Sequence, residues 1–553
     1  MNCFKFDGRI YFRIMNNKQN PFSLRLLFSA CLILLCFSMS AQKFYRDFYP
    51  NKKVRSEGKF NISGKEDSLW RFYYEDGTLQ EESVYRNGYF NGKVFRYHAN
   101  GKIQVEGYFK FGNEDSIQRT FNDKGIKIQE GNFSEGKKIN SWFTYYDNGK
   151  IQSETSYADS IAKLTSYFDK QGVQTVTNGT GILIEENDLG KISSKTTYTN
   201  GIQDGLFEGY FSKGNIQTNG YYVKGTKDGI WNEYFNDGKL RKTTTYKEGL
   251  VTGPYEEYFD NGKLNVKGSF DNGKKIGNWE WYRDNGVKDM EGNFVDDLQE
   301  GDWIFYHDNG LWQSKGKYYQ GKMEGKWVYQ YPSEKKWKEG NFVADDKEGE
   351  WTTWYEDGGL LQKGNYILGE ENGKWTSWYE NGKIKDEGNF KDGKMSGKWT
   401  GYEPKQGRYL YIGSWSNDIK VGKWLNYSER GDLQSLITYG KDGELNGLSR
   451  IYNENGRLIS EGKFKAGRRA GRWKYYYDFG ALWRDCTYKN GVMNGPSKIY
   501  TEKGALEEDA NYKNNRYHGE CTMYDKKSGK LVQRGIYENG KMIKFLEGTP
   551  VRK

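Results

Sequence analysis

The chain has 553 residues, of which 35% are hydrophobic and 17% aromatic, with 70 glycines and only 7 prolines. Disordered chains are poor in aromatic residues, so this composition excludes disorder and predicts many short strands. The net charge of +10 comes from 84 basic and 74 acidic residues that are interspersed along the chain. The densest basic cluster (Arg468, Arg469 and Arg472) lies in one loop, whereas nucleic-acid binding requires an extended basic stripe. We therefore expect no nucleic-acid partner.

Residues 1–41 are predicted to be a secretory signal peptide. Lys18 and Arg25 precede an apolar run, residues 26–41, which ends in small residues. This run is too short to predict a membrane-spanning helix, and no later apolar run predicts a transmembrane anchor. We therefore expect an exported protein of the cell envelope, located in the periplasm, at the cell surface or outside the cell.

A glycine recurs at intervals of 24 or 25 residues along most of the remaining chain. We call it the slot glycine, and its occurrences include Gly77, Gly101, Gly125, Gly149, Gly172, Gly190, Gly214, Gly238, Gly262, Gly286, Gly310, Gly358, Gly382, Gly407, Gly431, Gly456, Gly480, Gly504 and Gly529. Glu334 occupies the one vacant slot. Self-similarity at such a period indicates a repeat array.

Each repeat places the same residue types around its slot glycine. In the repeat of Gly382, Trp375 lies seven residues before the slot and Trp378 four before, while Ile384 follows at two and Phe390 at eight. Further glycines follow at six, eleven and fifteen residues, and those at eleven and fifteen are expected to turn the chain back. Asn-Gly between short aromatic and β-branched runs is the strongest local signal of a β-hairpin. The predicted fold is all-β, an elongated repeat array in a single-layer antiparallel meander of about twenty 24-residue β-hairpin units.

Two registers of this hairpin remain open. A two-residue Asn-Gly turn would place Trp375 opposite Gly388, where the aromatic ring would cover a strand glycine. A three-residue turn with a bulge would pair Trp378 with Ile384 and set Trp375 against Glu387.

One interval, from Gly172 to Gly190, is only 18 residues long and lacks the usual return segment. We therefore divide the chain into a first array at 42–165, a short irregular repeat or kink at 166–190, a second array at 191–545 and a tail at 546–553. The irregular repeat is interpreted either as a hinge or docking notch or as a deletion closed by a tighter turn.

The pattern W-x-x-Y-Y-x-N-G-K-I-x-x-E-G-x-F-x-x-G-K-x-x-G resembles the MORN-repeat variant found in exported bacterial 24-residue repeat proteins and in antitoxin-like proteins. The resemblance covers nearly all of the chain after residue 41. It implies a single-layer β-meander used for protein–protein or membrane-associated contacts. The antitoxin role fits poorly with a predicted signal peptide.

The sequence offers no recognisable catalytic or metal-binding constellation. His98, His307 and His518 lack the spacing of zinc ligands, and no nucleophile motif or phosphate-binding loop occurs. Cys486 and Cys521 are predicted to be free thiols, because they fall three strands apart, at roughly 14 Å. We therefore predict a protein that is not an enzyme and that uses no cofactor or metal.

A glutamate that precedes the strand glycine recurs in many repeats, and we interpret it as a cross-strand partner for lysine. Its occurrences include Glu106, Glu130, Glu291, Glu339, Glu387 and Glu461.

Exposed aromatic residues are the remaining binding candidates. Five tryptophans are less explained by the repeat pattern and are proposed as ligand-binding aromatics, namely Trp281, Trp312, Trp337, Trp415 and Trp483. The predicted function is an exported, non-enzymatic interaction or structural scaffold with protein partners in the cell envelope. The alternative is a glycan- or cell-wall-binding protein that uses exposed Trp and Tyr rings.

Overall fold

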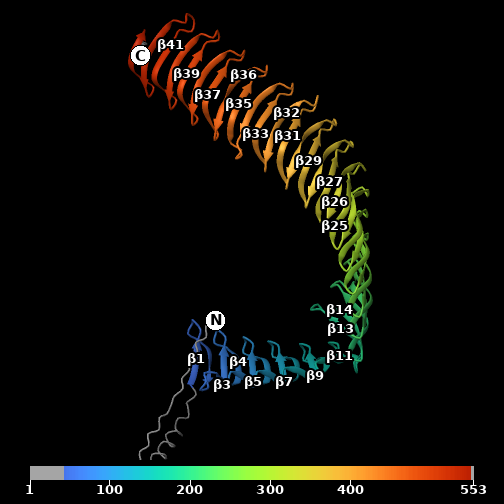
Figure 1. The fold of residues 1–553 in the computed structure, drawn as a ribbon. Coiled ribbons are helices and arrows are strands. Elements are labelled where there is room, and N and C mark those ends of the chain that lie inside the picture. The colour runs from blue at the N-terminus through green and yellow to red at the C-terminus, as the bar shows by residue number, and fades with distance from the viewer. Residues whose placement is uncertain (1–42, 550–553) are drawn as a thin grey trace, which may run out of the picture. The chain divides into compact units, whose positions relative to one another are not determined.

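The computed structural model describes residues 43–549 and shows them as 43 β-strands of one open antiparallel sheet, with no helix among the described residues (Figure 1). This confirms the predicted all-β meander. Within the same residues, no helix is long and apolar enough to cross a bilayer. The predicted signal peptide lies outside the described residues.

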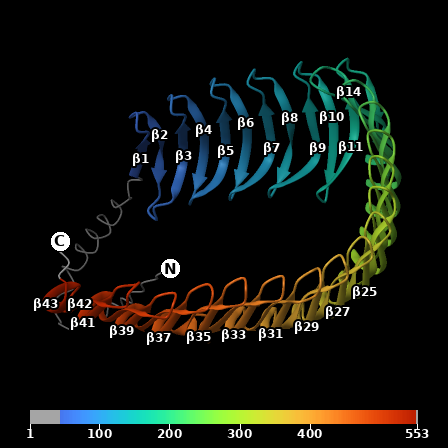
Figure 2. The same cartoon turned by 90° about the horizontal axis from the view of Figure 1, so that it is seen from above.

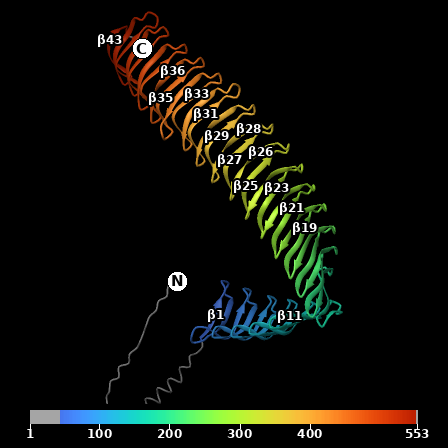
Figure 3. The same ribbon diagram turned by 45° about the vertical axis from the view of Figure 1, so that its right-hand side comes forward.

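The chain divides into two compact units, residues 1–228 and 229–553. Figure 2 shows β1 to β11 of the first unit in chain order, and Figure 3 shows β19 to β36 of the second unit in the same way.

The strands of the first unit are β1 (Lys43–Phe48), β2 (Val54–Phe60), β3 (Glu66–Tyr73), β4 (Leu79–Arg86), β5 (Tyr89–Tyr97), β6 (Ile103–Lys110), β7 (Asn113–Phe121), β8 (Lys127–Ser134), β9 (Lys137–Tyr145), β10 (Ile151–Ala158), β11 (Ile161–Phe168), β12 (Gln174–Thr177), β13 (Thr180–Glu186), β14 (Ile192–Thr199), β15 (Ile202–Tyr210) and β16 (Ile216–Val223).

The second unit, which holds most of β17, contains β17 (Thr226–Tyr234), β18 (Leu240–Lys247), β19 (Leu250–Tyr258), β20 (Leu264–Asp271), β21 (Lys274–Tyr282), β22 (Lys288–Val295), β23 (Leu298–Tyr306), β24 (Trp312–Tyr319), β25 (Lys322–Gln330), β26 (Lys336–Val343), β27 (Asp346–Trp354), β28 (Leu360–Ile367), β29 (Glu370–Trp378), β30 (Ile384–Lys391), β31 (Lys394–Tyr402), β32 (Tyr409–Ser416), β33 (Ile419–Tyr427), β34 (Leu433–Tyr439), β35 (Leu445–Tyr452), β36 (Leu458–Lys465), β37 (Arg468–Tyr476), β38 (Leu482–Lys489), β39 (Val492–Tyr500), β40 (Leu506–Lys513), β41 (Arg516–Tyr524), β42 (Leu531–Glu538) and β43 (Lys541–Gly548).

Each repeat has two kinds of turn, at opposite edges of the sheet. The slot turn between β29 and β30 is a three-residue loop that ends at Gly382, which has φ +79°. It is closed by a bond from the Gly382 N–H to the Tyr379 carbonyl (2.9 Å) and by another from the Tyr379 N–H to the Lys383 carbonyl (2.9 Å). The return turn between β30 and β31 has two residues, Asp392 and Gly393, with φ +50° and +72°. Positive φ at both positions is what a type I′ hairpin turn requires.

The register of the hairpin combines parts of both predicted alternatives. Next to the slot turn, Trp378 pairs with Ile384, as expected for a three-residue loop. A bulge then shifts the pairing by one residue, so that Trp375 pairs with Gly388, as expected for a two-residue turn. Gly397, which we expected in the return turn, instead lies within β31 with φ +67°.

A row of buried tryptophans forms the core of the sheet. Trp375 pairs with Gly388, but its ring covers Gly364 on the preceding strand, where a Cβ atom would lie only 2.1 Å from the ring. The indole N–H donates to the Asn365 carbonyl at 3.1 Å. The same contact recurs for Trp142, Trp279, Trp303, Trp327, Trp351, Trp399, Trp424 and Trp473. Each of these repeats therefore buries its tryptophan on the glycine of the repeat before it, and we call this side of the sheet the tryptophan face.

The irregular repeat (residues 166–190) builds its hairpin differently. β12 has only four residues and pairs with β13 at two positions, Val176 with Gly181 and Thr177 with Thr180. The return turns that follow approach each other closely, since the Gly201 N–H donates to the Gly179 carbonyl at 2.9 Å. The missing residues thus leave a shortened strand, with β12 and β13 paired only beside their turn.

Cys486 on β38 and Cys521 on β41 are free and buried, each 1% exposed. This confirms the prediction of free thiols. At the C-terminal end, β43 continues to Gly548.

Candidate functional site

Three of the five candidate tryptophans belong to the regular repeat pattern. Trp281 is stacked between Trp279 and Trp303, with ring centroids 5.8 Å from each. Trp415 lies eight residues after its slot glycine, where other repeats have Phe or Tyr, and its ring meets the buried Trp424 edge-on at 5.2 Å. Both rings therefore serve the packing of the sheet. Trp312 lies two residues after its slot, in the usual Ile or Leu position, and is half-buried.

Trp337 and Trp483 differ from these three because they expose 36% and 40% of their surface. Both occupy the bulge position, three residues after the slot, and both rings contact tyrosines of their own hairpin. They lie on β26 and β38, so the structure does not bring them together. The sequence pattern alone grouped them with Trp281 and Trp415, because it could not separate an exposed bulge position from a strand position.

Two of the three histidines occupy structural positions. His98 and His307 lie three residues before their slots, and each ring Nε2 bonds to a carbonyl of the following repeat, at 2.9 and 3.0 Å. In other repeats a tyrosine hydroxyl makes this contact, as Tyr379 does with the Tyr402 carbonyl at 2.9 Å. Across residues 43–549, no group of three or more His, Cys, Asp or Glu side chains is arranged to hold a metal ion.

The recurring glutamate lies on the face opposite the tryptophans. In two repeats it pairs with a lysine of the preceding strand, as predicted: Lys374 lies 2.8 Å from Glu387, and Lys326 lies 3.3 Å from Glu339. Glu291 instead accepts a hydrogen bond from Lys288 of its own strand at 2.8 Å and another from the Tyr306 hydroxyl of the next strand. Partial burial alone would raise the pKa of Glu291, but these two bonds outweigh it and lower the pKa below its ordinary value. Burial and the bond to Glu291 raise the pKa of Tyr306 to about 12. This network stabilises the sheet and leaves no free general acid or base at this glutamate.

Four consecutive return turns of the second unit carry a row of exposed apolar side chains. They follow β22, β24, β26 and β28, and each of the six side chains exposes 49% to 76% of its surface: Val295, Leu298, Tyr319, Val343, Ile367 and Leu368. We call this row the apolar edge. Leu298 reaches the next return turn, where its Cδ2 atom lies 3.5 Å from the position of a Cβ atom built on Gly321, so these two turns are in contact. Exposed apolar side chains that gather along one edge of a sheet are typical of interaction sites.

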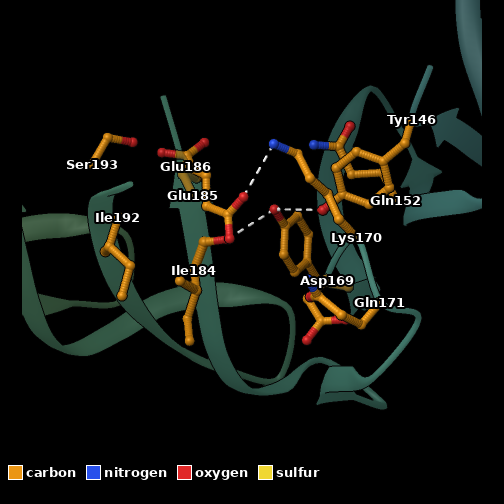
Figure 4. Close-up of a pocket in the computed structure, with 11 residues that line it drawn as sticks. Tyr146, Gln152, Asp169, Lys170, Gln171, Ile184, Glu185, Glu186, Ile192 and Ser193 are labelled. Carbon is orange, nitrogen blue, oxygen red and sulfur yellow. Dashed lines mark hydrogen bonds and ion pairs between the residues drawn. The ribbon is translucent and has the colours of Figure 1, made fainter. Parts of the chain in front are cut away.

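A cavity of about 450 Å³ lies at the irregular repeat (Figure 4). Tyr146, Gln152 and the turn residues 169–171 line one side, and residues of β13 and β14 line the other. Tyr167, which is 5% exposed, crosses between the two sides and donates from its hydroxyl to the Ile184 carbonyl at 2.9 Å. Lys170 and Glu186 form an ion pair at 3.0 Å. Sequence reasoning marked the place of this site from the short interval but not its lining, which comes from five separate segments.

Comparison with known families supports the repeat assignment. A family model described as MORN repeat variant matches ten segments of the chain, residues 66–87, 90–111, 140–159, 227–248, 251–272, 347–367, 371–392, 445–466, 469–490 and 493–514. The chain is a MORN-variant repeat protein. In structural terms, the match at 371–392 consists of β29, its slot turn, β30 and the start of the return turn.

The MORN-variant matches identify repeat units and no catalytic domain. Between them lie residues 160–226, which include β12 and β13 of the irregular repeat, and residues 273–346, which carry four side chains of the apolar edge. The two candidate surfaces thus lie largely outside the ten matched segments.

No curated protein matches this chain. Among solved structures, the crystal structure of TcdB2-TccC3-Cdc42 aligns with 91% of this chain and 27% of its own at 11% identity, with a TM-score of 0.13. TcdB2-TccC3 without its hypervariable C-terminal region aligns with 93% and 32% at 10% identity and a TM-score of 0.12. A Photorhabdus luminescens Tc holotoxin pore aligns with 91% and 29% at 12% identity and a TM-score of 0.12. The MORN-variant chain thus spans under a third of these solved chains, and scores this low carry no inference about its fold or role.

Proposed function

We propose that this MORN-variant protein is an exported, non-enzymatic scaffold of the cell envelope that docks a protein partner along its apolar edge. The observation that supports this proposal is the contrast between two sets of apolar side chains. The tryptophans are buried on glycines of the same sheet, whereas the six side chains of the apolar edge expose 49% to 76% of their surface. Burying such side chains against a partner contributes roughly 25 cal/mol per Å² of apolar surface.

Rigid presentation of the edge strengthens the proposal. Both central residues of each return turn have positive φ, as for Gln320 (+50°) and Gly321 (+80°), which fixes the path of the chain. Successive turns are also hydrogen-bonded to earlier strands, since the Gly321 N–H donates to the Gln299 carbonyl at 2.9 Å. A preorganised surface loses less conformational entropy on binding than a flexible loop does.

The docking proposal is tested by replacing exposed residues of the edge in the full chain. Leu298→Ser, Tyr319→Ser, Val343→Ser and Leu368→Ser are combined, and cross-linked partners are quantified by mass spectrometry in cells that produce each variant. A control with Val223→Ser and Leu250→Ser alters exposed apolar residues at other return turns. We expect the amount of cross-linked partner recovered with the fourfold variant to fall at least tenfold, and the amount recovered with the control to stay unchanged. Equal recovery from all variants would show that the edge does not dock a partner.

Export is a separate part of the proposal, and it rests on the apolar run at 26–41. Cell fractionation of the full chain and of a variant with Leu34→Arg and Leu35→Arg tests it. We expect the unaltered chain in the envelope or the medium, shortened by about the length of the signal peptide, and the variant in the cytoplasm. Cytoplasmic recovery of the unaltered chain at full length would contradict export.

Glycan binding through exposed rings is the second candidate function, and it rests on Trp337 and Trp483 alone, because the other three candidates are more buried. Retention of the full chain on insoluble peptidoglycan and polysaccharides, lost on Trp337→Ala or Trp483→Ala, would favour it.

A further inference from the structure

The cavity at the irregular repeat exists because two strands separate. β12 and β13 pair only at the two positions beside their turn, whereas neighbouring strands of a regular repeat pair over most of their length. Beyond Gly181, the strand β13 continues to pair with β14 but not with β12. The slot turn at residues 169–172 and the end of β13 are left facing each other across the cavity.

Side-chain bonds hold this cavity open. The Tyr167 hydroxyl bridges to the Ile184 carbonyl at 2.9 Å, and the Tyr146 hydroxyl donates to the Phe168 carbonyl at 2.8 Å. Lys170 and Glu186 span the opening as an ion pair (Figure 4). The volume of about 450 Å³ lies within the range of pockets that hold small organic ligands. The site is therefore preformed rather than dependent on closure around a ligand.

The charged groups of the lining already have partners inside the protein. Lys170 is paired with Glu186, Glu185 accepts a 2.6 Å hydrogen bond from the Ser194 hydroxyl, and Asp169 accepts one from the Val173 N–H at 2.8 Å. Each carboxylate nevertheless keeps capacity for further hydrogen bonds, because an ionised carboxylate has about four acceptor positions.

Neutral hydrogen-bonding groups stand beside these carboxylates. The lining adds the amides of Gln152 and Gln171 and the hydroxyl of Ser193, which provide donors as well as acceptors. Tyr146 and Ile192 add apolar surface. The lining as a whole thus mixes many acceptors, several donors and a smaller apolar part.

We propose that this cavity binds one or two residues of a neutral saccharide. Hydroxyl groups donate and accept at once, so a sugar matches a lining in which acceptors outnumber donors without bringing a charge. An anionic ligand would meet the carboxylates of Asp169, Glu185 and Glu186 at close range. A purely apolar ligand would desolvate these carboxylates without replacing their hydrogen bonds to water.

This site is independent of the apolar edge and of the exposed tryptophans. All eleven lining residues lie between Tyr146 and Ser193, in the first unit, whereas the apolar edge and Trp337 lie in the second. A chain with the fourfold edge substitution should therefore bind the sugar unchanged, so the failure of one proposal is distinguishable from the failure of the other.

The test is ligand-observed NMR on the full chain with glucose, galactose, mannose and N-acetylglucosamine as neutral probes. Glucuronate and glucosamine serve as charged counterparts. We expect at least one neutral sugar to bind, and to bind more tightly than either charged probe. Glu185→Gln and Gln152→Ala should each weaken that binding at least tenfold. Gln217→Ala, an exposed glutamine at the same repeat position as Gln152, should leave it unchanged.

Two results would overturn the proposal. The first is the absence of binding by every neutral probe, or neutral binding that neither Glu185→Gln nor Gln152→Ala weakens. The second is tightest binding by glucosamine or glucuronate, which would assign the cavity to a charged ligand. Native-state hydrogen exchange of β13 in each variant verifies that the cavity has kept its walls.

Discussion

The regular repeat of Gly382 and the irregular repeat at residues 166–190 are joined to their neighbouring strands by different contacts. The regular repeat packs against the preceding repeat by burying Trp375 on Gly364. The irregular repeat contains no tryptophan, and its strands are joined across a cavity by the hydroxyl of Tyr167. The tryptophan–glycine contact thus packs successive regular repeats together, whereas the shortened β12 leaves most of its neighbour β13 unpaired on that side and creates room for a ligand.

The largest expected effect tests the regular side of this comparison. Trp327 is 1% exposed, and Trp327→Ala should remove about 3–5 kcal/mol of local stability, because it leaves a cavity over Gly316. Native-state hydrogen exchange of β24 to β27 measures the loss. Trp483→Ala, at an exposed bulge position, should change the exchange of its own hairpin by no more than about 0.5 kcal/mol. Equal effects at both positions would contradict the assigned burial.

The next effect concerns the glycine of the same contact. A Cβ atom at Gly316 would lie 2.2 Å from the Trp327 ring, so Gly316→Ala should destabilise the repeat by about 1–3 kcal/mol. Gly107 has the same repeat position, but its nearest neighbour is the flexible Gln118 side chain at 3.5 Å. Chemical denaturation should therefore show Gly107→Ala to be close to neutral, and a similar loss in both variants would argue against ring coverage as the cause.

A smaller effect addresses the irregular side. Tyr167→Phe removes the donor to the Ile184 carbonyl, and leaving that carbonyl without its partner should cost about 1–3 kcal/mol. We expect faster hydrogen exchange in β13 and weaker sugar binding. Tyr379→Phe removes a comparable hydroxyl from a regular slot turn and should leave β13 unaffected. Unchanged exchange of β13 in Tyr167→Phe would show that the hydroxyl does not hold the cavity.

The smallest effect is a dependence on pH at the face opposite the tryptophans. The pKa of Glu291 is lower in the folded protein than in the unfolded chain. Glu291 therefore contributes fully to the free energy of unfolding above the ordinary pKa of a glutamate, and this contribution is lost as the pH falls through the native pKa. Glu291→Gln should cost about 0.2–1 kcal/mol at neutral pH, and this difference should shrink in acid. Denaturation at several pH values measures it, and a difference that grows in acid would reverse the assigned sign.

Much of the fold could be predicted because the same residue pattern recurs in many repeats. The slot glycines fixed the number and order of hairpins, and Gly382 indeed adopts positive φ. The register could not be settled, because a bulge beside Trp378 combines two patterns that were treated as exclusive. The sequence also could not predict which neighbouring strand the Trp375 ring covers, since both strands carry a glycine beside it.

The candidate sites were less predictable for a different reason. Trp312 and Trp415 were set apart from the repeat, although both occupy regular positions counted from Gly310 and Gly407. The apolar edge could not be predicted because it depends on a contact between Leu298 and the next return turn, at Gly321, and local sequence does not show such a contact. The short interval did mark the irregular repeat, but a missing segment gives no sign of which side chains will face the space it leaves.

The placement of these tryptophans on glycines of the preceding repeat affects how the gene of a repeat protein can gain or lose repeats. Unequal recombination between two repeats adds or removes 24 residues, and each tryptophan at the junction still finds a glycine eleven residues before it, as Trp399 finds Gly388. Duplication of a whole repeat between repeats that carry this pair therefore preserves the tryptophan–glycine contact. A deletion of six residues, as between Gly172 and Gly190, does not preserve the 24-residue spacing and leaves a shortened strand in the sheet.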